Sequence, residues 1–289
     1  MNIQSILIPL NQDQIQADWY DESLSAETDV IIMAHGLGGE KACGLDHFAQ
    51  FYHELGYRVC VFDHRGYGAS SGPVKHLVDK TSQLQDWATV IEYLNGELKI
   101  QDTQMILWGY SFSGGHVLTL AAKKKYKAII SNFPHVDGLA SLTLYPKKYL
   151  LPAIFLSLQD LALAPFGKIK TIPVVSKDRF AVLAGEDCYA GYHSIIPDVV
   201  QWNNEVPARI VATIGLYRPT ITAHQIHTPT LVVGAKQDSL IPIKATRKLI
   251  NKIENGQYLE VNCGHFDLFH APYQNYILQA HQKFLQTLD

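Results

Sequence analysis

Short, fully apolar runs recur along the 289-residue chain, and segments of helix length separate them. These runs lack the polar alternation of a strand with one wet face, so they are typical of strands buried on both sides in a parallel sheet. The pattern occurs at residues 30–34, 58–63, 105–109, 127–132, 230–235 and 258–262. The sequence therefore predicts an α/β fold with a mostly parallel, doubly wound sheet.

Two more strands are predicted at the start of the chain, at residues 5–10 and 14–20, on either side of a short polar turn. They suit an antiparallel pair at one edge of the sheet, which brings the sheet to eight strands. The first helix-length segment has Asp46 at its start and Gly56 at its end, where capping residues are expected. Later segments with helical periodicity are residues 82–96, 115–125, 243–253 and 271–288.

One connection is far longer than the rest. About a hundred residues separate the strands at 127–132 and 230–235, well beyond the usual length of a loop. The intervening stretch is rich in aromatic, aliphatic and proline residues. We expect an inserted, mainly helical cap over residues 134–228, with the core formed by residues 1–133 and 229–289.

Composition and charge narrow the class of partner. The net charge is -3 and no basic run exceeds residues 123–125, so a nucleic-acid partner is not expected. The first twenty residues lack the basic region of a signal peptide, and no uninterrupted apolar run reaches the roughly 18 to 20 residues that span a bilayer. The four cysteines are scattered without CxxC spacing, which indicates reduced thiols. The prediction is a soluble, cytoplasmic protein without a membrane span.

A tight turn after the strand at 105–109 contains two serines, Ser111 and Ser113. A nucleophile elbow needs small residues two positions before and after its serine, because the strained turn presses them against neighbouring backbone. Both serines meet this size rule. Ser111 directly follows the strand, whereas Ser113 would already lie in the helix, so Ser111 is the predicted nucleophile. Ser113 replaces the last glycine of the G-x-S-x-G pattern.

A serine nucleophile needs a base, and the base needs an orienting acid. Asp238 and His265 lie just past two of the predicted strands, so both would project from the carboxyl edge of the sheet. Their order along the chain after Ser111 is that of the α/β-hydrolases, and together the three predict a catalytic triad. Asp238 has a second interpretation as the cap of a helix beginning near Pro242, and Asp137 is an alternative acid.

Acyl transfer also needs fixed donors for the developing oxyanion. The backbone N–H of Phe112 is one candidate, and the glycine-rich loop at residues 35–39 offers Leu37 as the other. That loop lacks both the P-loop and the GxGxxG spacing, so no nucleotide cofactor is expected. His47 and His53 lie six residues apart on one predicted helix, which does not place them on one face, and no metal is expected.

Five motifs together resemble the α/β-hydrolase superfamily over nearly the whole chain: AHGLGG, FDHRGYGASSG, LWGYSFSGG, AKQDSLIP and CGH. The segments NFPHVDGLAS and WNNEVPARI are similar to a branch of dienelactone hydrolase-like and Xaa-Pro dipeptidyl-peptidase-like proteins, which includes fungal polyketide-cluster hydrolases and transferases. The resemblance implies a Ser111, Asp238, His265 triad with an oxyanion hole at Leu37 and Phe112. Dienelactone hydrolases proper use a cysteine nucleophile, and Ser111 departs from that.

The predicted function is that of a serine hydrolase acting on a small-molecule ester or thioester through an acyl-enzyme, without a cofactor. Aromatic and aliphatic residues of the cap favour a partly apolar substrate: Tyr145, Tyr149, Leu150, Phe155 and Leu156. An acyltransferase would use the same triad. An aminopeptidase would need an acidic clamp, for which Glu186 and Asp187 are candidates. A ligand-binding protein on a hydrolase fold is the non-enzymatic alternative.

The remaining polar residues of these motifs are predicted to be structural. Residues 63–65 follow a strand in a segment that is a turn in this type of fold, and Asp267 suits a loop-bonding carboxylate. His116 falls within the helix after the elbow and is expected in the core. Cys263 is interpreted as a small buried apolar residue.

Overall fold

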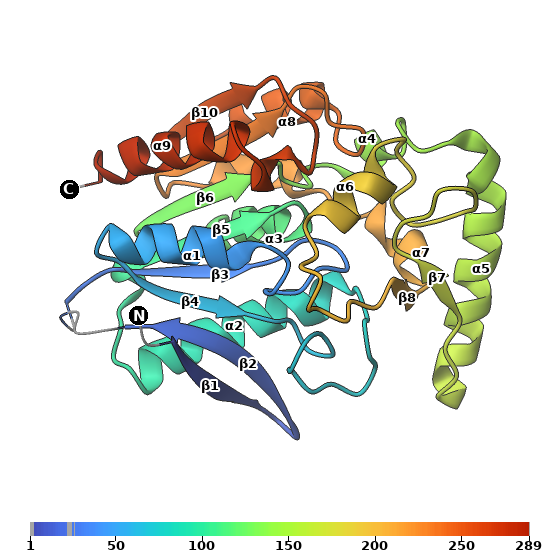
Figure 1. Cartoon of the computed structure of the whole chain (residues 1–289), viewed down its shortest axis with the longest axis horizontal. Coiled ribbons are helices and arrows are strands. Elements are labelled where there is room, and N and C mark those ends of the chain that lie inside the picture. Colours follow the sequence, from blue (N-terminus) through green and yellow to red (C-terminus); the bar gives the residue numbers. More distant parts are fainter. Residues whose placement is uncertain (1–2, 22–24, 26, 289) are drawn as a thin grey trace.

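An eight-stranded sheet forms the centre of the molecule in the computed structural model, which describes residues 3–21, 25 and 27–288 (Figure 1). The strand order is β1-β2-β4-β3-β5-β6-β9-β10. The pairs β1–β2 and β2–β4 are antiparallel, and the other five pairs are parallel. The strands are β1 Ile3–Leu10, β2 Asp13–Tyr20, β3 Val30–Ala34, β4 Arg58–Phe62, β5 Met105–Tyr110, β6 Ala128–Asn132, β9 Thr230–Ala235 and β10 Gly256–Val261. The predicted α/β fold with a mostly parallel, eight-stranded sheet is confirmed.

Helices cover both faces of this sheet, which is why the central strands carry no polar alternation. Helices α1 (Leu45–Glu54) and α9 (Tyr273–Leu285) pack on one face. Helices α2 (Lys80–Gly96), α3 (Phe112–Ala121) and α8 (Ile243–Ile250) pack on the other. Every residue of β3, β4, β5, β6 and β9 is buried. Their carboxyl ends consequently form one edge at which loop residues from several strands meet.

The start of α1 differs from the prediction. Asp46 is not its N-cap, because the helix begins at Leu45 and the capping position is Gly44, which has φ 82° and offers no side chain. Asp46 lies in the first turn instead, where a carboxylate still complements the helix dipole. Gly56 follows the end of the helix with φ +92°, as the cap rule predicted.

A long insertion, residues 133–229, connects β6 to β9. Its elements are α4 Gly138–Ser141, η2 Lys147–Tyr149, α5 Leu150–Leu163, η3 Ala164–Phe166, β7 Thr171–Pro173, α6 Cys188–Ser194, β8 Glu205–Pro207, α7 Ile210–Ile214, η4 Pro219–Ile221 and η5 Ala223–Gln225. Of these, α5, α6, α7, β7 and β8 lie beyond the carboxyl ends of the strands (Figure 1). Strands β7 and β8 form a small antiparallel sheet that the sequence did not indicate, because three residues give too short a pattern. The division into a core and a cap stays a prediction.

One stretch of the insertion, Lys147–Phe166, is long and apolar enough to cross a membrane by length and composition, and only 17% of its 18-residue apolar window is buried. The sequence prediction missed it because two lysines open the stretch and a serine, a glutamine and an aspartate interrupt its apolar run. Over an 18-residue window of this stretch, the mean hydropathy is nevertheless 1.4.

Candidate active site

Ser111 lies on a strained turn between β5 and α3. Its backbone has φ 54° and ψ -113°, outside the regions that a serine ordinarily adopts. A Cβ added to Gly36 would lie 2.8 Å from the Ser111 Cβ, and one added to Gly109 would lie 2.2 Å from the carbonyl oxygen of Ser113. The glycines are therefore required by close backbone approach, and the turn has the geometry of a nucleophile elbow.

The three residues predicted as a triad meet at the carboxyl edge of the sheet. Nε2 of His265 lies 3.0 Å from Oγ of Ser111, and Nδ1 of His265 lies 2.6 Å from Oδ2 of Asp238. The side chains of His265 and Asp238 are each 2% exposed. The Tyr110 hydroxyl donates to the carbonyl oxygen of His265 at 2.9 Å, which fixes the loop that carries the imidazole. The serine, base and acid are thus within hydrogen-bond distance of one another.

Asp238 combines the two interpretations that the sequence left open. One of its oxygens pairs with His265, and the other, Oδ1, accepts from the backbone N–H groups of Leu240 and Ile241 at 2.8 and 2.9 Å. These amides precede α8, whose own N-cap is Pro242. The turn therefore holds the carboxylate in one orientation towards the imidazole.

Asp137, the alternative acid, serves a different purpose. It caps α4 by accepting from the amides of Leu139 and Ala140, and it forms a two-pronged ion pair with Arg218 at 2.9 Å. Burial alone would raise the pKa of this carboxyl, but Arg218 and the α4 amides outweigh burial and lower it. No hydrogen bond joins Asp137 to His265 among the described residues, so the prediction of Asp137 as an alternative acid is not supported by the geometry.

The two candidate oxyanion donors lie beside Ser111. Phe112 is the first residue of α3, where the backbone N–H has no partner within the helix. Leu37 follows Gly36, whose backbone approaches the Ser111 side chain. Among the described residues, neither amide has a hydrogen-bond acceptor in the protein. Leu37 and Phe112 also line the same cavity as Ser111.

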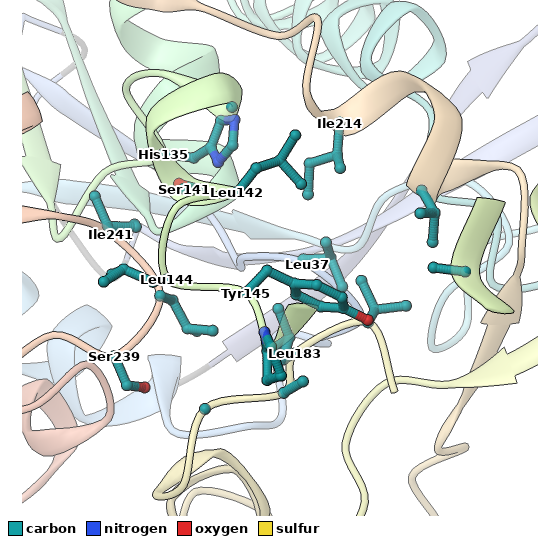
Figure 2. Close-up of a pocket in the computed structure, with 18 of the residues that line it drawn as sticks. Leu37, His135, Ser141, Leu142, Leu144, Tyr145, Leu183, Ile214, Ser239 and Ile241 are labelled. Carbon is teal, nitrogen blue, oxygen red and sulfur yellow. The ribbon is translucent and has the colours of Figure 1, made fainter. Parts of the chain in front are cut away.

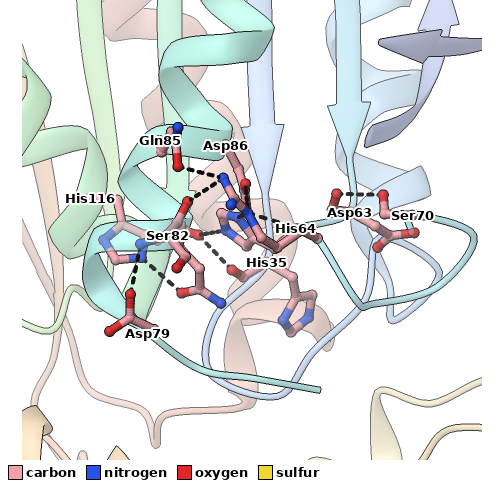
Figure 3. Close-up of polar contacts among 12 residues, drawn as sticks. His35, Asp63, His64, Ser70, Asp79, Ser82, Gln85, Asp86 and His116 are labelled. Carbon is pink, nitrogen blue, oxygen red and sulfur yellow. Dashed lines mark hydrogen bonds and ion pairs between the residues drawn. The ribbon is translucent and has the colours of Figure 1, made fainter. Parts of the chain in front are cut away.

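Ser113 has its own histidine and aspartate, which the sequence analysis did not anticipate. Its Oγ lies 3.3 Å from Nε2 of His64. Nδ1 of His64 in turn lies 3.2 Å from Oδ2 of Asp86 (Figure 3). Unlike Ser111, Ser113 is 1% exposed, and its hydroxyl donates to the carbonyl oxygen of His35 at 2.6 Å. This second constellation is closed to substrate and ties α3 to the loop that leads to Leu37.

The turn at residues 63–65 is structural, as predicted. Nε of Arg65 lies 2.5 Å from Oδ1 of Asp86, and this ion pair anchors α2 to the turn. Asp63 accepts from the backbone N–H of Lys41 at 2.6 Å, and burial raises its pKa to about 7 despite that contact. His116 is buried between Tyr217 and Gln83, and burial holds its pKa well below the usual value. None of these groups touches Ser111.

A cavity of about 170 Å³ opens beside Ser111, between the core and the insertion (Figure 2). Its lining is mainly aliphatic, with Leu142, Leu144 and Ile214 from the insertion and Ile241 from the core. Tyr145 and Leu150 line it as predicted, whereas Tyr149, Phe155 and Leu156 do not. An apolar cavity of roughly 150 Å³ holds a benzene molecule, so this one has room for an apolar substituent of similar size.

Other polar candidates lie outside this arrangement. Glu186 is exposed, and Asp187 accepts a hydrogen bond from Ser239. Asp267 accepts from the backbone N–H of Gly264 at 2.8 Å and is the loop-bonding carboxylate that was predicted. All four cysteines are buried free thiols, and burial raises the pKa of Cys263 to about 12. Within the described ranges, no group of three or more histidine, cysteine or acidic side chains is placed to hold a metal ion.

Comparisons with known proteins identify the class. The model of the family described as "alpha/beta hydrolase fold" matches residues 29–272. The chain belongs to this family, and it is an enzyme of the α/β-hydrolase type. The superfamily resemblance noted from the motifs is thereby confirmed, while the narrower dienelactone hydrolase-like and Xaa-Pro dipeptidyl-peptidase-like branch is not.

Several curated relatives match most of the chain. The quorum-quenching protein AidA of Acinetobacter baumannii (strain MDR-ZJ06) is 33% identical over 262 residues, covering 90% of this chain and 86% of that protein. The monoacylglycerol lipase of Mycolicibacterium smegmatis is 29% identical over 259 residues, covering 86% and 85%. Among solved structures, the α/β hydrolase GrgF from Penicillium sp. sh18 has a TM-score of 0.84 at 20% identity and covers 99% of each chain, which shows the shared fold.

Proposed function

We propose that this protein is a serine hydrolase that cleaves a carboxylic ester or thioester through an acyl-enzyme on Ser111. The observation that carries the proposal is the contact chain Ser111–His265–Asp238, at 3.0 and 2.6 Å, on an elbow that opens into a cavity. Hydrolases among the relatives, including the monoacylglycerol lipase, support the same chemistry.

Each residue of the site then has one role. His265 removes the proton from Oγ of Ser111 as that oxygen attacks the substrate carbonyl, and it later returns the proton to the leaving group. Asp238 holds the imidazole in place and stabilises its charged form. The amides of Leu37 and Phe112 donate to the oxyanion of the tetrahedral intermediate. A water molecule, activated by His265, then releases the acid from Ser111.

The cavity indicates the kind of substrate. Leu142, Leu144 and Ile214 offer an acyl or alcohol group dispersion contacts and no hydrogen bonds, so an apolar portion is favoured over a sugar or a charged group. Since these residues come from the insertion, we propose that residues 134–228 act as a cap that shapes the pocket. The substrate is accordingly a small-molecule acyl compound, handled by a protein that we expect in the cytoplasm.

Labelling with a fluorophosphonate tests the proposal. We expect the wild-type protein to be labelled, Ser111→Ala to lose labelling, and Ser113→Ala to retain it because the Ser113 hydroxyl is buried. Labelling that persists in Ser111→Ala would refute the assignment of the nucleophile. A wild-type protein that does not react at all would favour the ligand-binding alternative.

Two enzymatic alternatives share the triad. Release of product as an ester of an added alcohol, in place of the free acid, would identify an acyltransferase. An aminopeptidase would need an acidic clamp beside Ser111, and Glu186 is exposed while Asp187 is engaged with Ser239. The geometry therefore favours ester or thioester cleavage over peptide cleavage.

A further inference from the structure

Helix α5 presents an apolar face to the outside of the molecule. It lies at the far right edge of Figure 1, on the side of the insertion away from the central sheet. Leu151 is 80% exposed, Phe155 61% and Leu158 58%, at the spacing of one helical stripe. Leu161 and, beyond the end of the helix, Phe166 are also exposed, at 41% and 77%, and we call these five residues the α5 face. Exposure of this many large apolar side chains on one helix marks an interaction site.

The opposite side of α5 fixes the helix to the insertion. Ala153, Ser157 and Asp160 are buried there, and Asp160 forms an ion pair with Nε of Arg209 at 2.6 Å. Oδ1 of Asp160 also accepts from the backbone N–H of Lys170 at 2.7 Å. Although Lys147–Phe166 has the length and composition of a membrane span, a buried ion pair on one side suits a helix that lies flat on a surface.

Positive charge flanks the α5 face at both ends. Lys147 and Lys148 precede the helix, Lys168 and Lys170 follow it, and all four are exposed. Between residues 141 and 170 the sole acidic residue is Asp160, whose charge is matched by Arg209. A second copy docked with its α5 parallel or antiparallel to this one would bring lysines against lysines. An anionic surface instead complements them.

The α5 face also leads towards the pocket. Leu142, Leu144 and Ile154 are 37%, 42% and 51% exposed, and all three line the cavity beside Ser111. Ile154 belongs to α5 itself, so apolar surface extends from the outer side of the helix to the pocket lining. A second protein copy seated here would cover this approach, whereas a lipid surface would supply apolar chains to it.

We infer that the α5 face seats the protein peripherally on an anionic lipid surface, from which the apolar portion of the substrate enters the pocket. The inference rests on the proposed function for the entry of substrate, but the docking itself does not require Ser111. Leucine and phenylalanine side chains insert among the acyl chains, and the four lysines contact the headgroups. The substrate class is thus an ester or thioester of an amphiphile that partitions into lipid.

Flotation with vesicles tests the docking, with phosphatidylcholine alone and with phosphatidylcholine mixed with phosphatidylglycerol. The full-length protein is expected to float with the mixed vesicles and to bind less as salt is added. The variant Leu151→Ser/Phe155→Ser/Leu158→Ser should bind about 100-fold more weakly. The variant Lys147→Gln/Lys168→Gln should bind anionic vesicles about fivefold more weakly for each lysine removed, and its binding to phosphatidylcholine vesicles should not change.

A matched control substitutes three exposed apolar residues outside the insertion: Leu7→Ser, Leu98→Ser and Tyr276→Ser. This control should float like the wild type. The α5 triple variant should hydrolyse a short water-soluble ester at the wild-type rate, because its three positions lie outside the cavity lining. That unchanged rate would show that the variant is folded.

Two results would overturn the docking proposal. One is a wild-type protein that stays unbound with both vesicle types. The other is a wild-type dimer that the α5 triple variant converts to a monomer, which would assign the face to a second copy. Ser111→Ala separates the two proposals: it should still float while losing fluorophosphonate labelling, so that each proposal fails by its own measurement.

Discussion

At the scale of single residues, the two serines of the elbow have similar hydrogen-bond partners but differ in whether a substrate in the cavity can reach them. Each lies near a histidine that contacts an aspartate, Ser111 near His265 and Ser113 near His64. Ser111 lines the cavity, whereas Ser113 is buried and donates to His35. The size rule alone could not separate them, because both have small residues two positions away on each side. Exposure to the cavity gives Ser111 the position of a nucleophile.

Ser113→Ala tests whether this buried hydroxyl positions the loop that carries Leu37. Its loss removes the donor to the His35 carbonyl, a hydrogen bond with a net contribution of about 0.5–1.5 kcal/mol. We expect kcat for a short ester to fall roughly 3- to 10-fold with KM almost unchanged, because an oxyanion donor acts in the transition state.

Ser131→Ala is the matched control, since that buried hydroxyl donates to the carbonyl oxygen of Gly114 at 2.9 Å, on the same helix but away from the loop. It should lower the melting temperature to a similar extent and leave kcat near the wild-type value. An equal loss of kcat in both variants would argue against a positioning role for Ser113.

At the scale of elements, the strands were predictable and the insertion was less so. β3, β4, β5 and β9 are buried along their whole length, so their residues form unbroken apolar runs. The two strands β7 and β8 have three residues each and left no such pattern. Short elements depend on their partners across the chain, and the sequence carries little local signal for them.

Ile214→Trp tests whether the insertion sets the size of the substrate. Ile214 ends α7 and lines the cavity, so a larger ring there should fill part of it (Figure 2). We expect kcat/KM to fall at least about fivefold for esters of longer acyl chains and to change little for acetyl esters, since overfilling a packed pocket costs about 1–3 kcal/mol. Kinetics over a series of acyl lengths measures this.

Ala212→Trp provides the comparison, because this residue lies on the same helix but is exposed and outside the cavity lining. Its chain-length profile should match that of the wild type. A uniform loss of activity for all chain lengths in Ile214→Trp would place the acyl group elsewhere.

At the scale of the whole molecule, buried histidines link stability to pH. Burial lowers the pKa of His35 and His135 from the usual 6.5 to about 4 and that of His281 to about 3, and it holds the pKa of His116 well below 6.5. Below about pH 6.5 these histidines are therefore more protonated in the unfolded chain than in the folded protein. The contribution of these histidines to the free energy of unfolding is fully present above about pH 6.5, and it is lost as the pH falls towards their folded-state pKa values. Asp63, with its pKa raised to about 7, has the opposite sign and offsets part of the loss.

We expect the free energy of unfolding in urea to fall between about pH 7 and about pH 5, by up to about 1.4 kcal/mol per pH unit for each such histidine. His281→Gln removes one buried imidazole. The slope of the unfolding free energy against pH should therefore fall by up to about 1.4 kcal/mol per pH unit, which corresponds to one proton. His47→Gln, at an exposed position of α1, should leave the slope unchanged. An unchanged slope in His281→Gln would contradict the conclusion that buried His281 contributes to the loss of stability at low pH.

The central sheet and the residues at its carboxyl edge could be derived from the amino-acid sequence. Apolar runs set the strands, and because parallel strands end at one edge, Ser111, Asp238 and His265 could be expected to meet although 154 residues separate the serine from the histidine. Other features depend on side chains from distant segments and emerged only in the folded chain: the burial of Ser113 with His64 and Asp86, the lining of the cavity, and the outward direction of the apolar α5 face. A local pattern encodes which residues are apolar, but which of them face solvent depends on how the whole chain packs.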